Sequence, residues 1–339
     1  MRRAAAALGG AAVLALSGCG LLRAPTPVST TGAPPGAAQN APGAGQPAAA
    51  QRQTVPVSDL IHPRSGKYLG LEAPGAPDSL SPVQNVAESL GRQPNLLGQY
   101  TRWPHPFDTL SAANALSYGA LYYIAWEPFG VSVAQVGQGR SDAYITTFAR
   151  AIRAYRHPVA ISFGHEMNGY WYPWGTTGTG STPADFVAAW RHIHDLFARA
   201  GAGNVIWVWN PNVINPVPAV RLKPYWPGDA YVDWVGVTGY FAATGPDTFN
   251  GMYGPTMAQI RQFTRKPFII AETSVETGNN ELTSIDNLVS GVKETSDVMG
   301  LVWFDYNKLG VDWTVEDRPK ARAAMVSAIA GLPLVSVDR

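Results

Sequence analysis

The sequence predicts an α/β fold in which short buried strands alternate with helices along most of the chain. Three observations support this. The apolar runs are short, they are separated by amphipathic helical patterns, and they are apolar at successive positions, as in strands that are buried on both faces. Strands of this kind form parallel sheets, because the intervening helices cover both faces. Eight of them in one chain predict a single-domain (β/α)8 TIM barrel.

Eight apolar runs are the expected strands. They are residues 66–72, 94–100, 120–126, 158–164, 204–210, 232–240, 267–272 and 300–306. An open doubly wound sheet is the alternative, but that fold has a glycine-rich phosphate-binding turn after an early strand. The segment APGAPDSL follows the first run instead, so the barrel is favoured.

Four helices are expected between and after these strands, at residues 141–156, 182–201, 283–297 and 318–331. The second has the clearest boundaries. Thr182 is placed as its N-cap, Pro183 occupies its first turn, and Gly201 ends it.

The N-terminal segment differs in composition from the rest of the chain. Residues 1–18 have two arginines and then an apolar stretch, which is typical of a secretory signal peptide. The segment LSGC resembles a bacterial lipobox, which implies that Cys19 is lipidated and anchors the protein at the cell surface. An ordinary signal peptide with an incidental cysteine is the alternative. Residues 19–56 are rich in Ala, Pro and Gly and are expected to be a disordered linker. Residues 57–339 are then the folded domain.

Composition narrows the range of partners. The formal net charge is +1 and no basic cluster follows residue 3, so a nucleic-acid partner is not expected. The chain has one cysteine and six histidines, and it lacks an H-E-x-x-H motif, so neither a metal nor another cofactor is predicted. Eleven Trp and fourteen Tyr exceed what a core needs and suit the flat apolar faces of sugars. We expect a monomer that binds a polysaccharide or oligosaccharide.

Five of the 24 acidic residues fall at the ends of expected strands. They are Glu72, Glu127, Glu166, Glu272 and Asp305. In a (β/α)8 barrel the C-terminal strand ends form one mouth, which carries the active site. Crowded carboxylates there cost stability and therefore indicate function, although any single acid could be a helix cap or a solvated loop residue.

Glu166 and Glu272 are the strongest candidates among the five. Glu166 follows the fourth expected strand and Glu272 ends the seventh, and these two strands lie nearly opposite each other across the mouth. Two carboxyl groups about 5 to 5.5 Å apart are what retaining glycoside hydrolysis requires. One is the nucleophile and the other the general acid and base, and spacing alone does not assign the two roles.

The segments HEMNGYWYPWG and KPFIIAETS together resemble glycoside hydrolase family 26, over about residues 62–330. This resemblance implies a retaining (β/α)8 endo-β-glycanase with Glu166 as acid/base and Glu272 as nucleophile. It further implies substrate-binding roles for His165 and Trp171, for Tyr240 as a hydrogen-bond donor to the nucleophile, and for Trp303 beneath the sugar. Four further residues are candidates for sugar subsites, with a structural role as the alternative for each: Glu127, His105, Asn168 and Trp174.

The substrate is left open between β-1,4-mannan, a mixed-linkage or β-1,4-glucan, and a glycan of the producer's own envelope. Thr238 stands where mannanases of the family often have Asp, which argues against mannan. Two other classes of protein remain as alternatives. One is a non-catalytic sugar-binding lipoprotein, and the other an esterase, for which the chain lacks a G-x-S-x-G motif.

Overall fold

The structure is a computed structural model that describes residues 55–175, 181–278, 280–308 and 310–337. The predicted signal peptide, Cys19 and nearly all of the predicted linker lie outside the described residues. Within the described part, no helix combines the length and the apolar character needed to span a bilayer.

Eight parallel strands form a closed barrel in sequence order, and β1 pairs with β8 to complete it. The strands are β1 (Tyr68–Glu72), β2 (Leu96–Arg102), β3 (Leu121–Glu127), β4 (Val159–Phe163), β5 (Val205–Trp209), β6 (Trp234–Thr238), β7 (Phe268–Thr273) and β8 (Val298–Phe304). Each lies within or overlaps one of the eight predicted runs. The prediction of a (β/α)8 barrel is confirmed.

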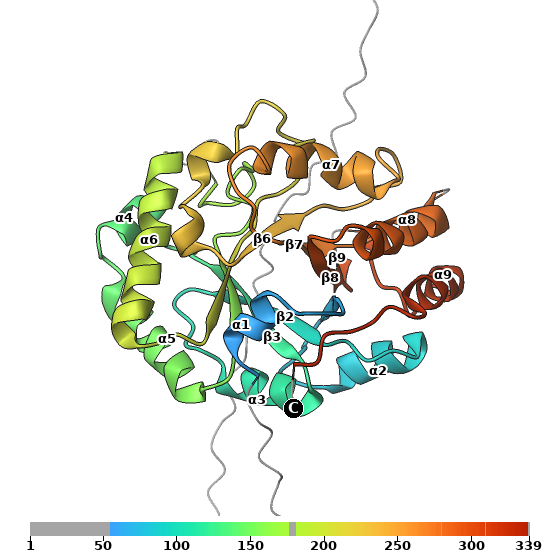
Figure 1. Cartoon of the computed structure of the whole chain (residues 1–339), viewed down its shortest axis with the longest axis horizontal. Coiled ribbons are helices and arrows are strands. Elements are labelled where there is room, and N and C mark those ends of the chain that lie inside the picture. Colours follow the sequence, from blue (N-terminus) through green and yellow to red (C-terminus); the bar gives the residue numbers. More distant parts are fainter. Residues whose placement is uncertain (1–54, 176–180, 279, 309, 338–339) are drawn as a thin grey trace, which may run out of the picture.

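Helices surround the strands (Figure 1). They are α1 (Val57–Ile61), α2 (Ser81–Leu90), α3 (Thr109–Tyr118), α4 (Val133–Gly137), α5 (Asp142–Tyr155), α6 (Pro183–Ala200), α7 (Phe249–Ile260), α8 (Glu281–Glu294) and α9 (Pro319–Ile329). Two short 3-10 turns, at Lys223–Tyr225 and Asp229–Tyr231, follow β5. The four predicted helices correspond to α5, α6, α8 and α9.

Helix α6 begins and ends as its sequence predicts. The Thr182 side chain accepts a hydrogen bond from the Asp185 backbone N–H, and the Asp185 carboxylate bonds back to Thr182, which completes a capping box. Gly201 ends the helix in the left-handed conformation that favours glycine.

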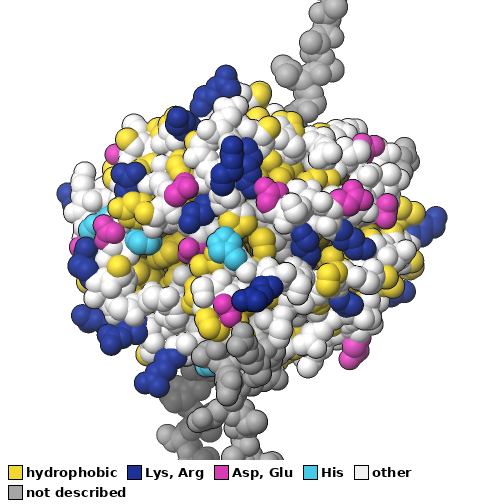
Figure 2. All heavy atoms as spheres, in the orientation of Figure 1, with side chains coloured by type: hydrophobic (Ala, Val, Ile, Leu, Met, Phe, Trp, Pro, Cys, Tyr) yellow, Lys and Arg dark blue, Asp and Glu magenta, His cyan; other side chains and the backbone are white. Residues whose placement is uncertain are grey.

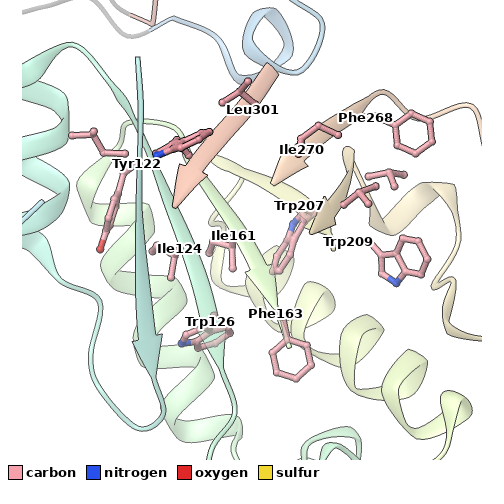
Figure 3. Close-up of a cluster of buried hydrophobic side chains, with 14 of the residues drawn as sticks. Tyr122, Ile124, Trp126, Ile161, Phe163, Trp207, Trp209, Phe268, Ile270 and Leu301 are labelled. Atoms are coloured by element: carbon pink, nitrogen blue, oxygen red, sulfur yellow. The ribbon is translucent and has the colours of Figure 1, made fainter. Parts of the chain in front are cut away.

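The apolar side chains form two layers. The outer layer lies between the strands and the helices, and Figure 3 shows part of it, including Trp126, Phe163 and Trp209. The inner layer fills the barrel and includes Tyr123 and Val302. Residues that alternate along a strand therefore face opposite layers, and both are buried, which explains why the strands read as continuous apolar runs.

Helix α1 closes the N-terminal end of the barrel. The Tyr68 hydroxyl donates to the Leu60 carbonyl at 2.8 Å, and the Trp234 indole N–H donates to the Ile61 carbonyl at 3.0 Å. Tyr68 and Trp234 are the first residues of β1 and β6. Because this end is covered by α1, the opposite end, where the strands terminate, is the one available for a site.

The face drawn in Figure 2 carries basic and acidic side chains interspersed, without a continuous field of one sign. This distribution agrees with the net charge of +1. It gives no electrostatic footprint for a polyanion on that face.

Helices α7 and α8 pack closely at Gly291, which provides a test of the fold. A Cβ there would overlap Cβ and Cγ of Phe249, so we expect Gly291→Ala to destabilise the protein by about 1–3 kcal/mol. Gly254 is the matched control, because a Cβ there would meet only the Asn250 Cβ at 3.9 Å. Gly254→Ala should cost clearly less than Gly291→Ala, although Pro255 at the next position offsets part of the gain in helix propensity. Urea unfolding of both variants measures the difference; equal stabilities would contradict this packing.

Candidate active site

Glu166 lies just beyond the end of β4, in the segment Gly164–His165–Glu166. Its φ is +56°, one of two positive values among the described non-glycine residues. This conformation is uncommon for a residue with a side chain and costs about 1 kcal/mol or more. The backbone N–H of Glu166 donates to the Asn210 carbonyl at 2.7 Å, which ties the turn to the end of β5. Strain of this kind, held by a specific contact, is typical of functional positions.

Two N–H donors hold the Glu166 carboxyl group. The Trp171 indole N–H donates to Oε2, and the Asn212 side-chain amide donates to Oε1 at 2.8 Å. Asn212 is itself fixed by Asn168, which exchanges two hydrogen bonds with its backbone, both at 2.9 Å. The carboxyl is therefore oriented by three side chains from two different loops.

Burial keeps the Glu166 carboxyl protonated near neutral pH. Loss of solvent contributes most, the charge of Glu272 adds to it, and together they raise the pKa of Glu166 to about 8. The hydrogen bonds from Asn212 and Trp171 oppose this shift, because they favour the ionised form. A carboxyl of this kind can give a proton to a departing oxygen at neutral pH.

Glu272 lies in β7 and is 8% exposed. Its two oxygens each accept a hydrogen bond from a tyrosine: Oε2 from Tyr100 at 2.6 Å, and Oε1 from Tyr240. Burial raises the pKa of Glu272, but both phenols and the charge of Lys308 lower it. Glu166 likewise accepts two hydrogen bonds and interacts with Lys308, so the two carboxyls differ in that the charge of Glu272 further raises the pKa of Glu166 and no neighbouring carboxylate raises that of Glu272, in agreement with a nucleophile.

The other predicted acids divide into two groups. Glu72 and Glu127 are buried and interact through their charges with each other, and both interact with Glu272. Burial, more than the charge of Glu272, raises the pKa of Glu127 to about 7. Asp305 belongs elsewhere, because its Oδ1 accepts from the Trp303 indole and from the Val315 backbone N–H at 2.8 Å. Four of the five acids therefore share the mouth, and Asp305 holds the segment after β8.

His165 is enclosed by rings. It is 1% exposed and lies 5.8 Å from Tyr100, 4.8 Å from Tyr172 and 5.6 Å from Trp174, measured between ring centroids. Burial lowers the pKa of His165 to about 3, so the imidazole is neutral. Both ring nitrogens are buried and have no hydrogen-bond partner in the protein, so the role of His165 in substrate binding stays a prediction.

Three predicted substrate-binding residues are buried. Trp303 is 3% exposed and belongs to the outer core layer, because it alternates along β8 with Val302, which faces the inside of the barrel. Trp174 is 1% exposed, and its indole N–H donates to the His165 carbonyl at 2.6 Å. Asn168 is fully buried and bonds to Asn212. These positions favour the structural alternative for all three, and their roles in substrate binding stay predictions.

The remaining predicted residues are at accessible positions. Trp171 and Tyr240 are half-buried, and each donates to one of the two central carboxyls. The predicted hydrogen bond from Tyr240 to Glu272 is confirmed. His105 is exposed on the loop after β2, and its role in a subsite stays a prediction.

Three residues of the site were missed by sequence reasoning. Tyr100 is the last residue of the second predicted strand, and a strand-end position indicates the barrel mouth whether or not the residue is acidic. Asn212 lies two residues beyond the fifth. Trp313 packs against Tyr240 with ring centroids 5.0 Å apart and is half-buried, so it is a better candidate than Trp303 for a sugar platform. Trp313 follows the short hairpin of β9 (Asn307–Lys308) and β10 (Val311–Asp312), which no sequence pattern predicted.

Across the described residues, no three side chains of His, Cys, Asp or Glu are grouped as metal ligands would be.

The fold and the site together define a (β/α)8 barrel whose C-terminal end holds two unlike carboxyl groups on facing strands. Comparison with known proteins specifies the class further. The family model of glycosyl hydrolase family 26 matches residues 140–307, which include both Glu166 and Glu272. The chain belongs to this family.

Curated relatives include several glycanases. Endoglucanase H of Acetivibrio thermocellus is 32% identical over 267 residues, which cover 75% of this chain and 29% of that protein. A β-1,3-xylanase of a Vibrio species is 31% identical over 42% of this chain and 29% of its own length. Mannan endo-1,4-β-mannosidase A and B of Caldalkalibacillus mannanilyticus is 29% identical over 42% of this chain and 27% of its length. The chain thus spans less than a third of each of these relatives.

Solved structures share the fold. A mannanase of Bacillus subtilis superposes with a TM-score of 0.60 at 16% identity, covering 83% of this chain and 90% of that one. A family 26 β-mannanase of Bacteroides ovatus gives 0.59 at 16% identity, covering 83% and 93%. At this identity the likeness establishes the barrel alone.

One prediction concerns the amide that holds Glu166. Asn212→Ala removes a donor that favours the carboxylate, so we expect the pKa of Glu166 to rise above about 8. The alkaline limb of kcat/KM should then move to higher pH, and the rate should fall about tenfold because the carboxyl is less well oriented. Asn204→Ala is the control, since Asn204 bonds to Ile152 and His157 before the start of β5. An unmoved limb in Asn212→Ala would contradict this role.

Proposed function

We propose that this protein is a retaining endo-β-glycosidase that hydrolyses a β-linked polysaccharide by double displacement. The observation that carries the proposal is the unlike treatment of two interacting carboxyls. Both carboxyls are buried, accept two hydrogen bonds and interact with Lys308, but the charge of Glu272 further raises the pKa of Glu166, whereas no neighbouring carboxylate raises that of Glu272. Family membership supports the same conclusion.

In the first step, ionised Glu272 attacks the anomeric carbon while Glu166 protonates the departing glycosidic oxygen. A covalent glycosyl-enzyme forms and the leaving chain departs. In the second step, ionised Glu166 removes a proton from water, which attacks the same carbon and releases Glu272. Each displacement inverts the configuration of the same anomeric carbon, so the product has the configuration of the substrate.

The substrate that we propose is a β-glucan, of the mixed-linkage or β-1,4 type. The match to endoglucanase H extends over 267 residues, whereas those to the xylanase and the mannanase named above extend over 143 and 148. Thr238 supports this choice. It is fully buried and donates to the Asn210 side chain at 3.2 Å, so this position does not present a carboxylate to the sugar.

A substrate screen tests the function. Protein lacking residues 1–56 is incubated with barley glucan, lichenan, carboxymethyl cellulose, glucomannan, mannan and β-1,3-xylan, and the products are sized. We expect short oligosaccharides from barley glucan, and proton NMR of the first product should show the β-anomer. First-formed α-anomer would exclude retention, release of only monosaccharide would exclude endo action, and preference for mannan would redirect the substrate assignment.

We further propose that Cys19 is lipidated and anchors the mature protein at the cell surface as a monomer. The lipobox-like LSGC segment and the Ala/Pro/Gly-rich residues that follow it support this. Expression of the full chain in a bacterial host should place wild-type protein in the membrane fraction. Cys19→Ala should release it from that fraction, and unchanged membrane retention of the variant would contradict the anchor.

A further inference from the structure

Tyr100 lies between two carboxyl groups. Its hydroxyl is 2.6 Å from Oε2 of Glu272 and 3.0 Å from Oε2 of Glu72, which is the last residue of β1. Room for the Glu72 carboxyl is provided by Gly98, where a Cβ would overlap Cγ and Oε1 of Glu72. Gly98 and Tyr100 both lie on β2. Gly98 leaves space for the Glu72 carboxyl, and the Tyr100 hydroxyl lies within hydrogen-bond distance of both Glu72 and Glu272.

The number of protons restricts this arrangement. A phenol has one O–H, so it donates one hydrogen bond along its axis and accepts others. Two ionised carboxylates are acceptors only. If both contacts of Tyr100 are hydrogen bonds, then one of the two carboxyls must itself carry a proton and donate it to the phenol oxygen.

The surroundings decide which carboxyl that is. Glu272 accepts a hydrogen bond from a second phenol, Tyr240, whereas Lys308 favours ionisation of both carboxyls and does not distinguish them. Glu72 is 1% exposed, and its Oε1 has no hydrogen-bond partner. A buried oxygen without a hydrogen-bond partner costs much more free energy on an ionised carboxylate than on a neutral carboxylic acid. Burial, followed by the charge of Glu272, raises the pKa of Glu72 well above its ordinary value.

We propose that Glu72 is held as a neutral carboxylic acid and acts through Tyr100 as a positioning residue for the nucleophile Glu272. The chain of donors runs from the Glu72 carboxyl to the Tyr100 oxygen and from the Tyr100 hydroxyl to Oε2 of Glu272. A phenol that accepts a hydrogen bond becomes a stronger donor, so Glu72 strengthens the bond that keeps Glu272 oriented and ionised. This inference rests on the proposed function, because it assigns the nucleophile to Glu272.

It also accounts for the crowding of acids at the mouth. With Glu72 and Glu166 both neutral, Glu272 does not face two further negative charges. Six ionisable side chains interact with Glu272 through charge or hydrogen bonds, each from a different strand or loop. They are Glu72, Tyr100, Glu127, Glu166, Tyr240 and Lys308.

The test compares two replacements of Glu72. Glu72→Gln keeps a neutral donor of the same shape, so kcat/KM on barley glucan should stay within about threefold of wild type, with the acid limb of its pH profile unmoved. Glu72→Ala removes the donor and should lower kcat/KM about 10-fold, and Tyr100→Phe about 10- to 100-fold. In Tyr100→Phe the acid limb should move to higher pH, because Glu272 loses a bond that favours its ionised form. Tyr155→Phe is the matched control, since that hydroxyl bonds to the Ala112 carbonyl outside the site.

An ionised Glu72 gives the opposite result. Removing its charge in Glu72→Gln would make Glu272 easier to ionise, so the acid limb would shift to lower pH. That shift, or a loss in Glu72→Gln as large as in Glu72→Ala, would overturn the proposal. Melting temperatures of all variants establish that they are folded.

A second measurement does not depend on activity. In protein labelled with carbon-13 at glutamate side-chain carboxyls, the Glu72 resonance is assigned by its loss in Glu72→Gln. We expect it to keep the chemical shift of a neutral acid at pH 7, and the shift of a carboxylate there would overturn the proposal. Wild-type protein without activity on any glycan would refute the proposed function and leave this result to decide the protonation of Glu72.

Discussion

Glu272→Ala is expected to lower kcat on polysaccharide by roughly 10⁴- to 10⁶-fold, the range found when a nucleophile is removed from an active site. Without this carboxylate no glycosyl-enzyme can form, and Tyr100 and Tyr240 lose their shared acceptor. The fold should persist, because the substitution removes a buried group whose ionised form is disfavoured by burial. Initial rates and a melting curve of the same preparation check both statements.

Added azide provides the control for Glu272→Ala. The small anion can occupy the space left by the carboxylate and attack the anomeric carbon from the same side, which yields a glycosyl azide of inverted configuration. We expect azide to restore part of the rate in Glu272→Ala and to have no such effect on wild-type protein. A variant that retains wild-type activity without azide would remove Glu272 from the mechanism.

Glu166→Ala is expected to lower the rate on polysaccharide by about 10²- to 10⁴-fold, the contribution typical of a general acid and base. The loss should depend on the leaving group. A dinitrophenolate leaves without a proton, so formation of the glycosyl-enzyme from dinitrophenyl glycosides should be nearly unaffected. Its hydrolysis should be slow, because the base that activates water is gone. A burst of dinitrophenol followed by a slow steady state is the expected signature; equal losses on both substrates would contradict this role.

The pH dependence of the wild-type protein follows from the same group. Glu166 must be protonated for the first step, and burial raises its pKa to about 8, so kcat/KM should fall as pH rises through about 8. The free energy of unfolding should also depend on the protonation of Glu166. Between about 4.5 and 8 the folded protein holds a proton that the unfolded chain releases, so this carboxyl lowers stability progressively over that range. Glu166→Gln should weaken that decline, and denaturant unfolding at pH 5 and pH 8 measures it.

The barrel could be predicted because its strands carry their own signature. Runs such as 158–164 and 267–272 are apolar on both alternations, and this pattern requires a layer on each side of the sheet. Helix α6 was predictable to within a residue because Thr182 and Gly201 mark its ends chemically. Helix α7 was not, since it contains Pro255 and two glycines, although Thr248 caps its N-terminus and it packs against α8.

The two central acids could also be predicted, because the end of a barrel strand fixes where a residue lies along the barrel axis. The position along a strand does not fix which side of the sheet a side chain faces. One residue of register separates Trp303 in the outer layer from Val302 inside the barrel, and an irregular pairing of β7 with β8 falls between Phe268 and Thr273. An aromatic residue at a strand end therefore does not reveal by itself whether it meets substrate or core.

By itself the sequence determined the barrel, the mouth and the placement of Glu166 and Glu272 on facing strands, since these depend on hydrophobic periodicity and chain order. The folded arrangement was needed to show that Tyr100, Asn212 and Trp313 join the site and that the Tyr100 hydroxyl connects Glu72 to Glu272. These contacts join residues from different strands and loops, and their hydrogen bonds and burial depend on distances of a few ångströms that no local pattern encodes.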